Sequence, residues 1–232
     1  MSAEARSRAY RVFAEAFAYP QGELLDEIRS GALSEALGEA LEAVSPSLAS
    51  SLDRAALRVY EDADADALAA EYTRLFDVGT SGPPCPLHGG LWIGDRMKTM
   101  EEVLRFYRHF GLTVGGEPSE LPDHLGLELE FLHYLAFREG AALHDGTDPG
   151  AFERAERDFL ARHPARVVPL LRAKLEHEHA APFFMALARA LEGLLAHAGA
   201  ELAGRGPRTP ADPASKRRSR AQRAEGERSQ SD

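Results

Sequence analysis

The amino-acid sequence predicts an all-α protein: a single-domain bundle of about eight to ten helices with a disordered C-terminal tail. Through most of residues 1–204, apolar side chains recur at helical spacing, and no segment alternates convincingly as a strand. Proline and glycine positions divide this pattern into segments of typical helix length. With 232 residues, 44% of them hydrophobic, the chain can bury a core without disulfides or metals.

The N-terminal helices follow from apolar stripes and the residues that break them. Tyr10, Phe13 and Phe17 lie on one stripe, and Pro20 ends the helix that carries them. A proline at position 46 suits the first turn of a later helix. Further helices in this half are expected over residues 24–28, 33–41, 46–60 and 64–76.

Two loops interrupt the helical pattern. Residues 77–94 are rich in glycine and proline and show no regular period, which is typical of a functional loop rather than a short connection. A helix from Met97 to Gly111 separates this loop from a second one at residues 113–122, and the most apolar helix of the chain follows. The last helices are expected to begin near Ala151, at Pro164 and at Ala181.

The charge is unevenly distributed. The net charge is -10, but residues 205–232 hold eight basic and four acidic residues and carry +4, which leaves -14 on residues 1–204. The tail has too little apolar surface to offset the entropy of ordering, so we predict disorder there. Its basic run at residues 216–220 could contact RNA, a membrane surface or an acidic partner, or simply be solvated. The acidic domain argues against nucleic-acid binding and favours cationic partners, although solubility alone would also explain it.

Cysteine use and the N-terminus indicate the compartment. The one cysteine, Cys85, cannot form an internal disulfide, which favours a reducing environment. No apolar run approaches the ~20 residues that cross a bilayer. The first residues mix charged and apolar side chains and do not form a secretory signal. We therefore expect a cytoplasmic protein without stable membrane association.

The segment from Pro122 carries a candidate binding site. Pro122 suits the first turn of a helix and would place Asp123 and His124 at its positive end. That field favours an ionised aspartate and disfavours protonation of the histidine. Such a pair suits a guanidinium, which a carboxylate binds with two hydrogen bonds. The plain alternative is that Asp123 only caps the helix.

Metal spacing gives a second hypothesis, an enzyme. Glu130 with His133, and Glu176 with His179, both form Glu-x-x-His pairs, as in helical di-metal carboxylate oxidases. Such a site needs a glutamate from each of two further helices, and no obvious candidates exist. Chance also explains two matches in a chain with nine histidines.

A third feature lies in the first loop. Cys85 and His88 could supply two zinc ligands or half of a thiol-hydrolase dyad, but no second ligand pair or orienting partner is recognisable. A shaped loop covering a groove is the simpler interpretation. Phosphate loops, nucleophile elbows and dinucleotide fingerprints are also missing from the sequence, which argues against a nucleotide-dependent enzyme.

Taken together, residues 71–76, the Gly/Pro loop, residues 117–132 and residues 182–188 resemble the TorD/DmsD group of redox-enzyme maturation chaperones, to which NarJ-type proteins are related. The resemblance extends from about residue 7 to about residue 200. The run Pro-Asp-His-Leu followed by Glu-Leu-Glu-Phe-Leu is its most specific part. Tyr72 stands where relatives often have tryptophan, and the Cys85 loop and the basic tail are not general to the group.

The resemblance implies a chaperone that is not an enzyme and needs no cofactor or metal of its own. Members bind the twin-arginine signal peptide and the catalytic subunit of a molybdenum enzyme of the DMSO-reductase type. They hold that subunit until the molybdenum cofactor is inserted, before assembly or export. Monomers and domain-swapped homodimers both occur in the group. The departures noted above suggest a subgroup serving dimethylsulfide-, ethylbenzene- or selenate-type enzymes.

The resemblance also implies which residues bind the client. The aspartate–histidine pair corresponds to Asp123 and His124, and the aromatic helix before the first loop supplies the apolar contacts. An acidic domain with a carboxylate at a helix start would suit two arginines followed by an apolar run. The full candidate set for signal-peptide and client binding is Tyr72, Leu75, Phe76, Trp92, Pro122, Asp123, His124 and Glu128.

Overall fold

The computed structural model describes residues 1–61, 63–77, 79, 82–115 and 120–205. These residues form helices joined by loops and contain no strand, so the all-α prediction is confirmed. The predicted disorder of the tail concerns residues 206–232, which lie outside the described part. The α-helices are α1 (Ala3–Ala16), α2 (Gly22–Ser30), α3 (Ala32–Val44), α4 (Pro46–Ser50), α5 (Arg54–Leu57), α6 (Ala65–Tyr72), α7 (Arg96–His109), α8 (Leu125–His144), α9 (Gly150–Arg162), α10 (Pro164–His177) and α11 (Pro182–Gly204).

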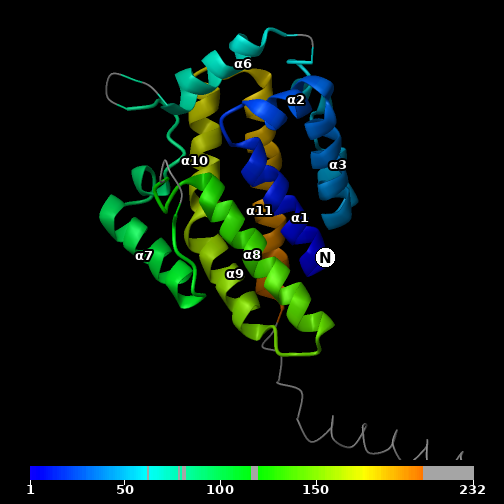
Figure 1. The fold of residues 1–232 in the computed structure, drawn as a ribbon, viewed down its shortest axis with the longest axis vertical. Helices are drawn as coiled ribbons and strands as arrows, with labels where there is room; N and C mark the ends of the chain where they lie inside the picture. The colour runs from blue at the N-terminus through cyan, green and yellow to red at the C-terminus, as the bar shows by residue number, and fades with distance from the viewer. Residues whose placement is uncertain (62, 78, 80–81, 116–119, 206–232) are drawn as a thin grey trace, which may run out of the picture.

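The helices pack around one hydrophobic core. α1 and α8 lie side by side in the middle of the bundle and make its most extensive helix contact (Figure 1). α10 pairs with α11 behind them, and α2 and α3 cover one flank. α7 lies at the opposite edge, close to the two long loops (Figure 1). In the described part of the chain, no helix is long and apolar enough to cross a membrane.

Local capping explains several helix boundaries. The Ser2 side chain accepts a hydrogen bond from the Ala5 N–H at the start of α1, and Asp95 accepts two from the first turn of α7. Gly31 joins α2 to α3 with a left-handed φ of 78°, which side chains strongly disfavour. These caps satisfy backbone groups that a helix end otherwise leaves unpaired.

Two predicted helix boundaries were wrong. The expected helix over residues 46–60 is divided into α4 and α5, because the Asp53 side chain accepts a hydrogen bond from the Ala56 N–H and starts a new helix there. α8 begins at Leu125 rather than at Pro122. A π-helical turn over Thr73–Asp77 also extends α6 to the first loop.

A buried group of charges joins three helices. Arg6 of α1 is fully buried and forms ion pairs with Glu139 of α8 and Glu156 of α9, the latter at 2.7 Å. Tyr10 donates a hydrogen bond to Glu156 at 3.1 Å. Arg205 reaches Glu139 from the end of α11 at 2.8 Å. Because each buried carboxylate has a cationic partner, the group fixes how these helices meet.

We predict that Arg6→Met destabilises the fold by about 3–5 kcal/mol, since it leaves two carboxylates buried without their principal cation. Urea unfolding followed by far-UV circular dichroism measures the change. Arg11→Met is the matched control, because Arg11 lies on the same helix with 66% of its side chain exposed. The control should change the stability by less than about 0.5 kcal/mol. Equal effects of the two substitutions would contradict this account.

Candidate functional site

The first loop is attached to the start of α8 by a short antiparallel pairing. His88 and His124 form an isolated bridge. The Gly89 N–H donates to the Asp123 carbonyl at 2.8 Å, and the Leu125 N–H donates to the Leu87 carbonyl at 2.7 Å. Two segments that are far apart in the sequence thereby become one surface.

Asp123 is fully buried beneath this pairing. Its Oδ2 accepts a hydrogen bond from the Gly90 N–H at 2.9 Å, while Oδ1 has no hydrogen-bond partner among the described residues. A Cβ at Gly90 would lie 3.0 Å from Oδ2 and 2.9 Å from the Cα of Arg96, so the turn needs glycine there. Asp123 therefore neither caps α8 nor faces solvent. In this conformation it positions the loop.

His124 is the residue that caps α8. Its Nδ1 accepts a hydrogen bond from the Gly126 N–H at 3.2 Å. Burial, together with the charge of His88, lowers the pKa of His124 although Glu120 and Asp123 act in the opposite direction. The imidazole is therefore neutral at pH 7 and carries its proton on Nε2. A neutral histidine was predicted here, but its main cause is burial rather than the field of the helix.

Glu120 supplies the accessible negative charge. Half of its side chain is exposed, and Oε1 lies 3.2 Å from His88 Nε2. Burial opposes ionisation, but His124, the Leu121 N–H and His88 outweigh it and lower the pKa of Glu120. Unlike Asp123, this carboxylate can meet a guanidinium from outside. The sequence did not single out Glu120 or His88 as candidates for peptide binding, although both stand in the segments that carried the resemblance.

A second carboxylate and a histidine lie buried nearby. Both oxygens of Glu128, and both ring nitrogens of His163, have no hydrogen-bond partner within the described residues. Burial, reinforced by the charge of Asp123, raises the pKa of Glu128 well above its usual range. Burial lowers the pKa of His163 to about 4. His163 is therefore uncharged near neutral pH, burial favours the protonated form of Glu128, and Glu128 is not available to a client in this conformation.

The apolar residues predicted to contact the client belong to the core. Tyr72, Leu75 and Phe76 are buried, and the Tyr72 hydroxyl donates to the Phe17 carbonyl at 3.1 Å. Burial, followed by the charges of Glu120 and Asp77, raises the pKa of Tyr72.

The exposed continuation of the cluster is Tyr19, whose ring meets Tyr72 edge-on at 5.3 Å. Tyr19 lines a shallow, largely apolar hollow of about 580 Å³ with Ala69, Ala70, Thr73, Arg74 and Pro84. The hollow is wide enough to hold apolar side chains. It is an apolar surface outside the core, next to the buried cluster of Tyr72, Leu75 and Phe76.

Trp92 and Pro122 hold the loops in place. The half-buried indole of Trp92 donates to the Pro86 carbonyl at 2.8 Å. The Pro122 carbonyl accepts a hydrogen bond from the Tyr107 hydroxyl at 3.0 Å. Both residues therefore shape the surface around His88 and Glu120.

The Cys85 hypotheses are not supported. Cys85 is buried, and burial raises the pKa of its thiol to about 11, which keeps it protonated and unreactive. Its N–H donates to the Leu75 carbonyl at 2.8 Å and ties the loop to the π-helical turn. His88 pairs with Glu120 instead.

The di-metal hypothesis is also not supported. His133 Nδ1 lies 2.8 Å from the Ser7 hydroxyl, and Glu176 pairs with Arg172. His179 is exposed beyond the end of α10, and Glu130 is exposed on α8. In the part of the chain that the structure describes, no three histidine, cysteine or acidic side chains come close enough to hold a metal ion.

Sequence comparison identifies the family of this fold. The model of the family described as nitrate reductase delta subunit matches residues 32–173, more than half of the chain. The chain belongs to that family. The resemblance to redox-enzyme maturation chaperones is thereby confirmed.

Three relatives of this nitrate reductase delta subunit family member are named as assembly chaperones. The perchlorate reductase assembly chaperone of Dechloromonas aromatica (strain RCB) is 33% identical over 79% of this chain and 83% of its own. The dimethyl sulfide dehydrogenase assembly chaperone of Rhodovulum sulfidophilum is 33% identical over 86% of this chain and 82% of its own. The chlorate reductase assembly chaperone of Ideonella dechloratans is 42% identical over 48% of this chain and 58% of its own.

We predict that Glu128→Gln makes this family member progressively more stable than the wild type as the pH rises. The unfolded carboxyl ionises near 4.5, whereas the buried one resists ionisation to higher pH. The wild type should therefore lose about 1.4 kcal/mol per pH unit between 4.5 and its raised folded pKa, and the variant should not. Urea unfolding at a series of pH values measures this slope. Glu130→Gln, at an exposed position of the same helix, serves as the control. If the difference in free energy of unfolding between Glu128→Gln and the wild type does not change with pH, the prediction is refuted.

Proposed function

We propose that this protein is a cytoplasmic chaperone without catalytic activity that binds the catalytic subunit of a molybdenum-containing oxidoreductase. It would engage the twin-arginine signal peptide and hold the subunit for cofactor insertion before assembly or export, acting as a monomer or homodimer. The observation that carries the proposal is the match to two assembly chaperones, one of a perchlorate reductase and one of a dimethyl sulfide dehydrogenase. Each match covers about four-fifths of the relative's length. The cofactor would belong to the client, not to this chain.

Glu120 would receive the arginines of the signal peptide. It is an exposed, ionised carboxylate beside two histidines, on a domain whose formal charge is -14 over residues 1–204. A guanidinium can bind a carboxylate with two parallel hydrogen bonds, and His124 remains neutral beside it. The cationic end of the peptide would then lie at the junction of the two loops.

The apolar run of the peptide would follow into the hollow beside Tyr19. The Tyr19 ring packs against Tyr72, and the charge of Glu120 acts on Tyr72 through space, so an extended peptide could reach from the carboxylate to the hollow. Asp123 would act as a positioning residue that holds the Gly89–Leu91 turn below Glu120. A segment lying in a groove with a charged anchor at one end is a common mode of peptide recognition.

We predict that Glu120→Lys weakens binding of a synthetic peptide, containing two adjacent arginines and a following leucine-rich run, by about tenfold or more. Charge reversal replaces attraction by repulsion at the proposed anchor. Fluorescence anisotropy of the labelled peptide measures the dissociation constant. A peptide with both arginines replaced by glutamine should bind the two proteins equally weakly.

The control for this prediction is Glu42→Lys, the same change of charge at an exposed position of α3. It should retain wild-type affinity, and thermal melts should show that both variants are folded. Wild-type affinity in Glu120→Lys would remove Glu120 from the site, and absence of peptide binding by the wild type would count against the proposed function.

A further inference from the structure

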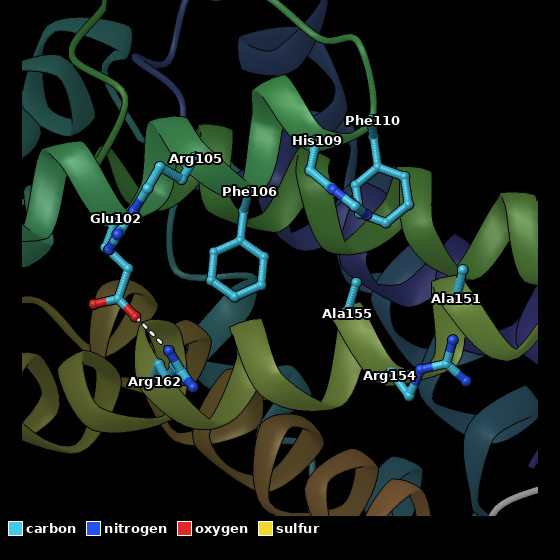
Figure 2. A pocket seen from close by; sticks show the side chains of 9 residues that line it. All are labelled: Glu102, Arg105, Phe106, His109, Phe110, Ala151, Arg154, Ala155 and Arg162. Atoms are coloured by element: carbon cyan, nitrogen blue, oxygen red, sulfur yellow. Dashed lines mark hydrogen bonds and ion pairs between the residues drawn. The ribbon is translucent and has the colours of Figure 1, made fainter.

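A second binding surface lies between α7 and α9, away from the loop junction. The groove has a volume of about 450 Å³ (Figure 2). It is lined by Glu102, Arg105, Phe106 and His109 of α7, by Phe110 directly after α7, and by Ala151, Arg154, Ala155 and Arg162 of α9. The α7 residues recur every three or four positions and so share one face of the helix. Small alanines on the facing helix leave the space open.

The floor of the groove is aromatic and firmly packed. Figure 2 shows Phe106 pointing from α7 into the space above α9. Its ring meets Phe159 edge-on at 5.1 Å, and Phe110 stacks on Phe152 at 5.6 Å. Both phenylalanines remain only partly buried, so they present a preformed apolar surface at the bottom of a polar rim.

The rim of the groove is basic, whereas the domain as a whole is acidic. Three arginines and one glutamate give it a formal charge of +2 with His109 neutral, whereas residues 1–204 carry -14. Glu102 pairs with Arg162 at 2.7 Å. Arg105 and Arg154 are exposed, and neither forms an ion pair with another residue in the described ranges. Two cations are therefore available to a ligand.

The arrangement of the cations distinguishes between ligands. Arg105 lies near the Glu102–Arg162 pair at one end of the groove, and Arg154 lies at the other end, with Phe106 between them (Figure 2). A compact anion such as phosphate requires donors that converge on one point. Separated arginines with an apolar floor between them match carboxylates spaced along a peptide, and arginine and aromatic residues are enriched in protein interfaces.

We propose that the α7–α9 groove binds an acidic peptide segment of the client polypeptide, with its carboxylates on Arg105 and Arg154 and a large apolar side chain on Phe106. This inference rests on the proposed function for the identity of the partner. The Glu120 site would bind a basic segment of the client, and the groove would bind an acidic one. One client would therefore contact the chaperone at two surfaces.

The test compares Arg105→Glu/Arg154→Glu with Arg29→Glu/Arg189→Glu, an equal change of charge at exposed positions of α2 and α11. The probe is a labelled ten-residue peptide in which acidic pairs flank one phenylalanine, measured by fluorescence anisotropy at low salt. We expect the groove variant to bind at least about tenfold more weakly than the wild type, and the control within about twofold. Replacing the phenylalanine of the peptide by serine should also weaken binding.

The twin-arginine peptide distinguishes this inference from the proposed function. The groove variant should bind that peptide as the wild type does, because its Glu120 site is intact. If the acidic peptide does not bind, or binds both variants equally, the groove inference fails while the Glu120 site stands. Displacement of the acidic peptide by equimolar inorganic phosphate or a nucleotide would assign the groove to a compact anion and also overturn the inference.

Discussion

The two backbone hydrogen bonds between residues 87–89 and 123–125 are the constraint on which the candidate site depends. They attach a Gly/Pro-rich loop to the first turn of α8, and the buried carboxylate of Asp123 reinforces them by accepting the Gly90 N–H. Without this pairing, His88 would have no fixed position beside Glu120. An aspartate that could have been a binding residue thus acts inside the fold, and the exposed charge is supplied three residues earlier.

Buried charge has different consequences in different parts of the molecule. Arg6 is matched by Glu139 and Glu156, so that group stabilises the packing of α1, α8 and α9. Glu128 has no such partner among the described residues, and burial raises its pKa and favours its protonated form. The first arrangement joins three helices of the bundle, whereas the second places a carboxyl group without an ionic partner among the described residues beside the loop junction.

Much of the helical architecture could be predicted, because apolar period and proline positions are local signals. The stripe through Tyr10, Phe13 and Phe17 gave α1 its buried face. Burial of Asp123 could not be predicted, since it depends on contact with Gly90 from a distant segment. The exposure of Tyr19 rather than Tyr72 likewise depends on how several helices meet. Sequence motifs therefore indicated a candidate region, but not which of its side chains face outward in the fold.

The measurement that tests the central claim most directly is capture of the client from the cells that produce this protein. A tagged copy would be purified under conditions in which anaerobic respiratory enzymes are expressed, and the eluate analysed by mass spectrometry. The account predicts recovery of a molybdoenzyme catalytic subunit that still carries its twin-arginine signal peptide. Recovery of no such subunit, although the enzyme is present in the same cells, would contradict the chaperone function.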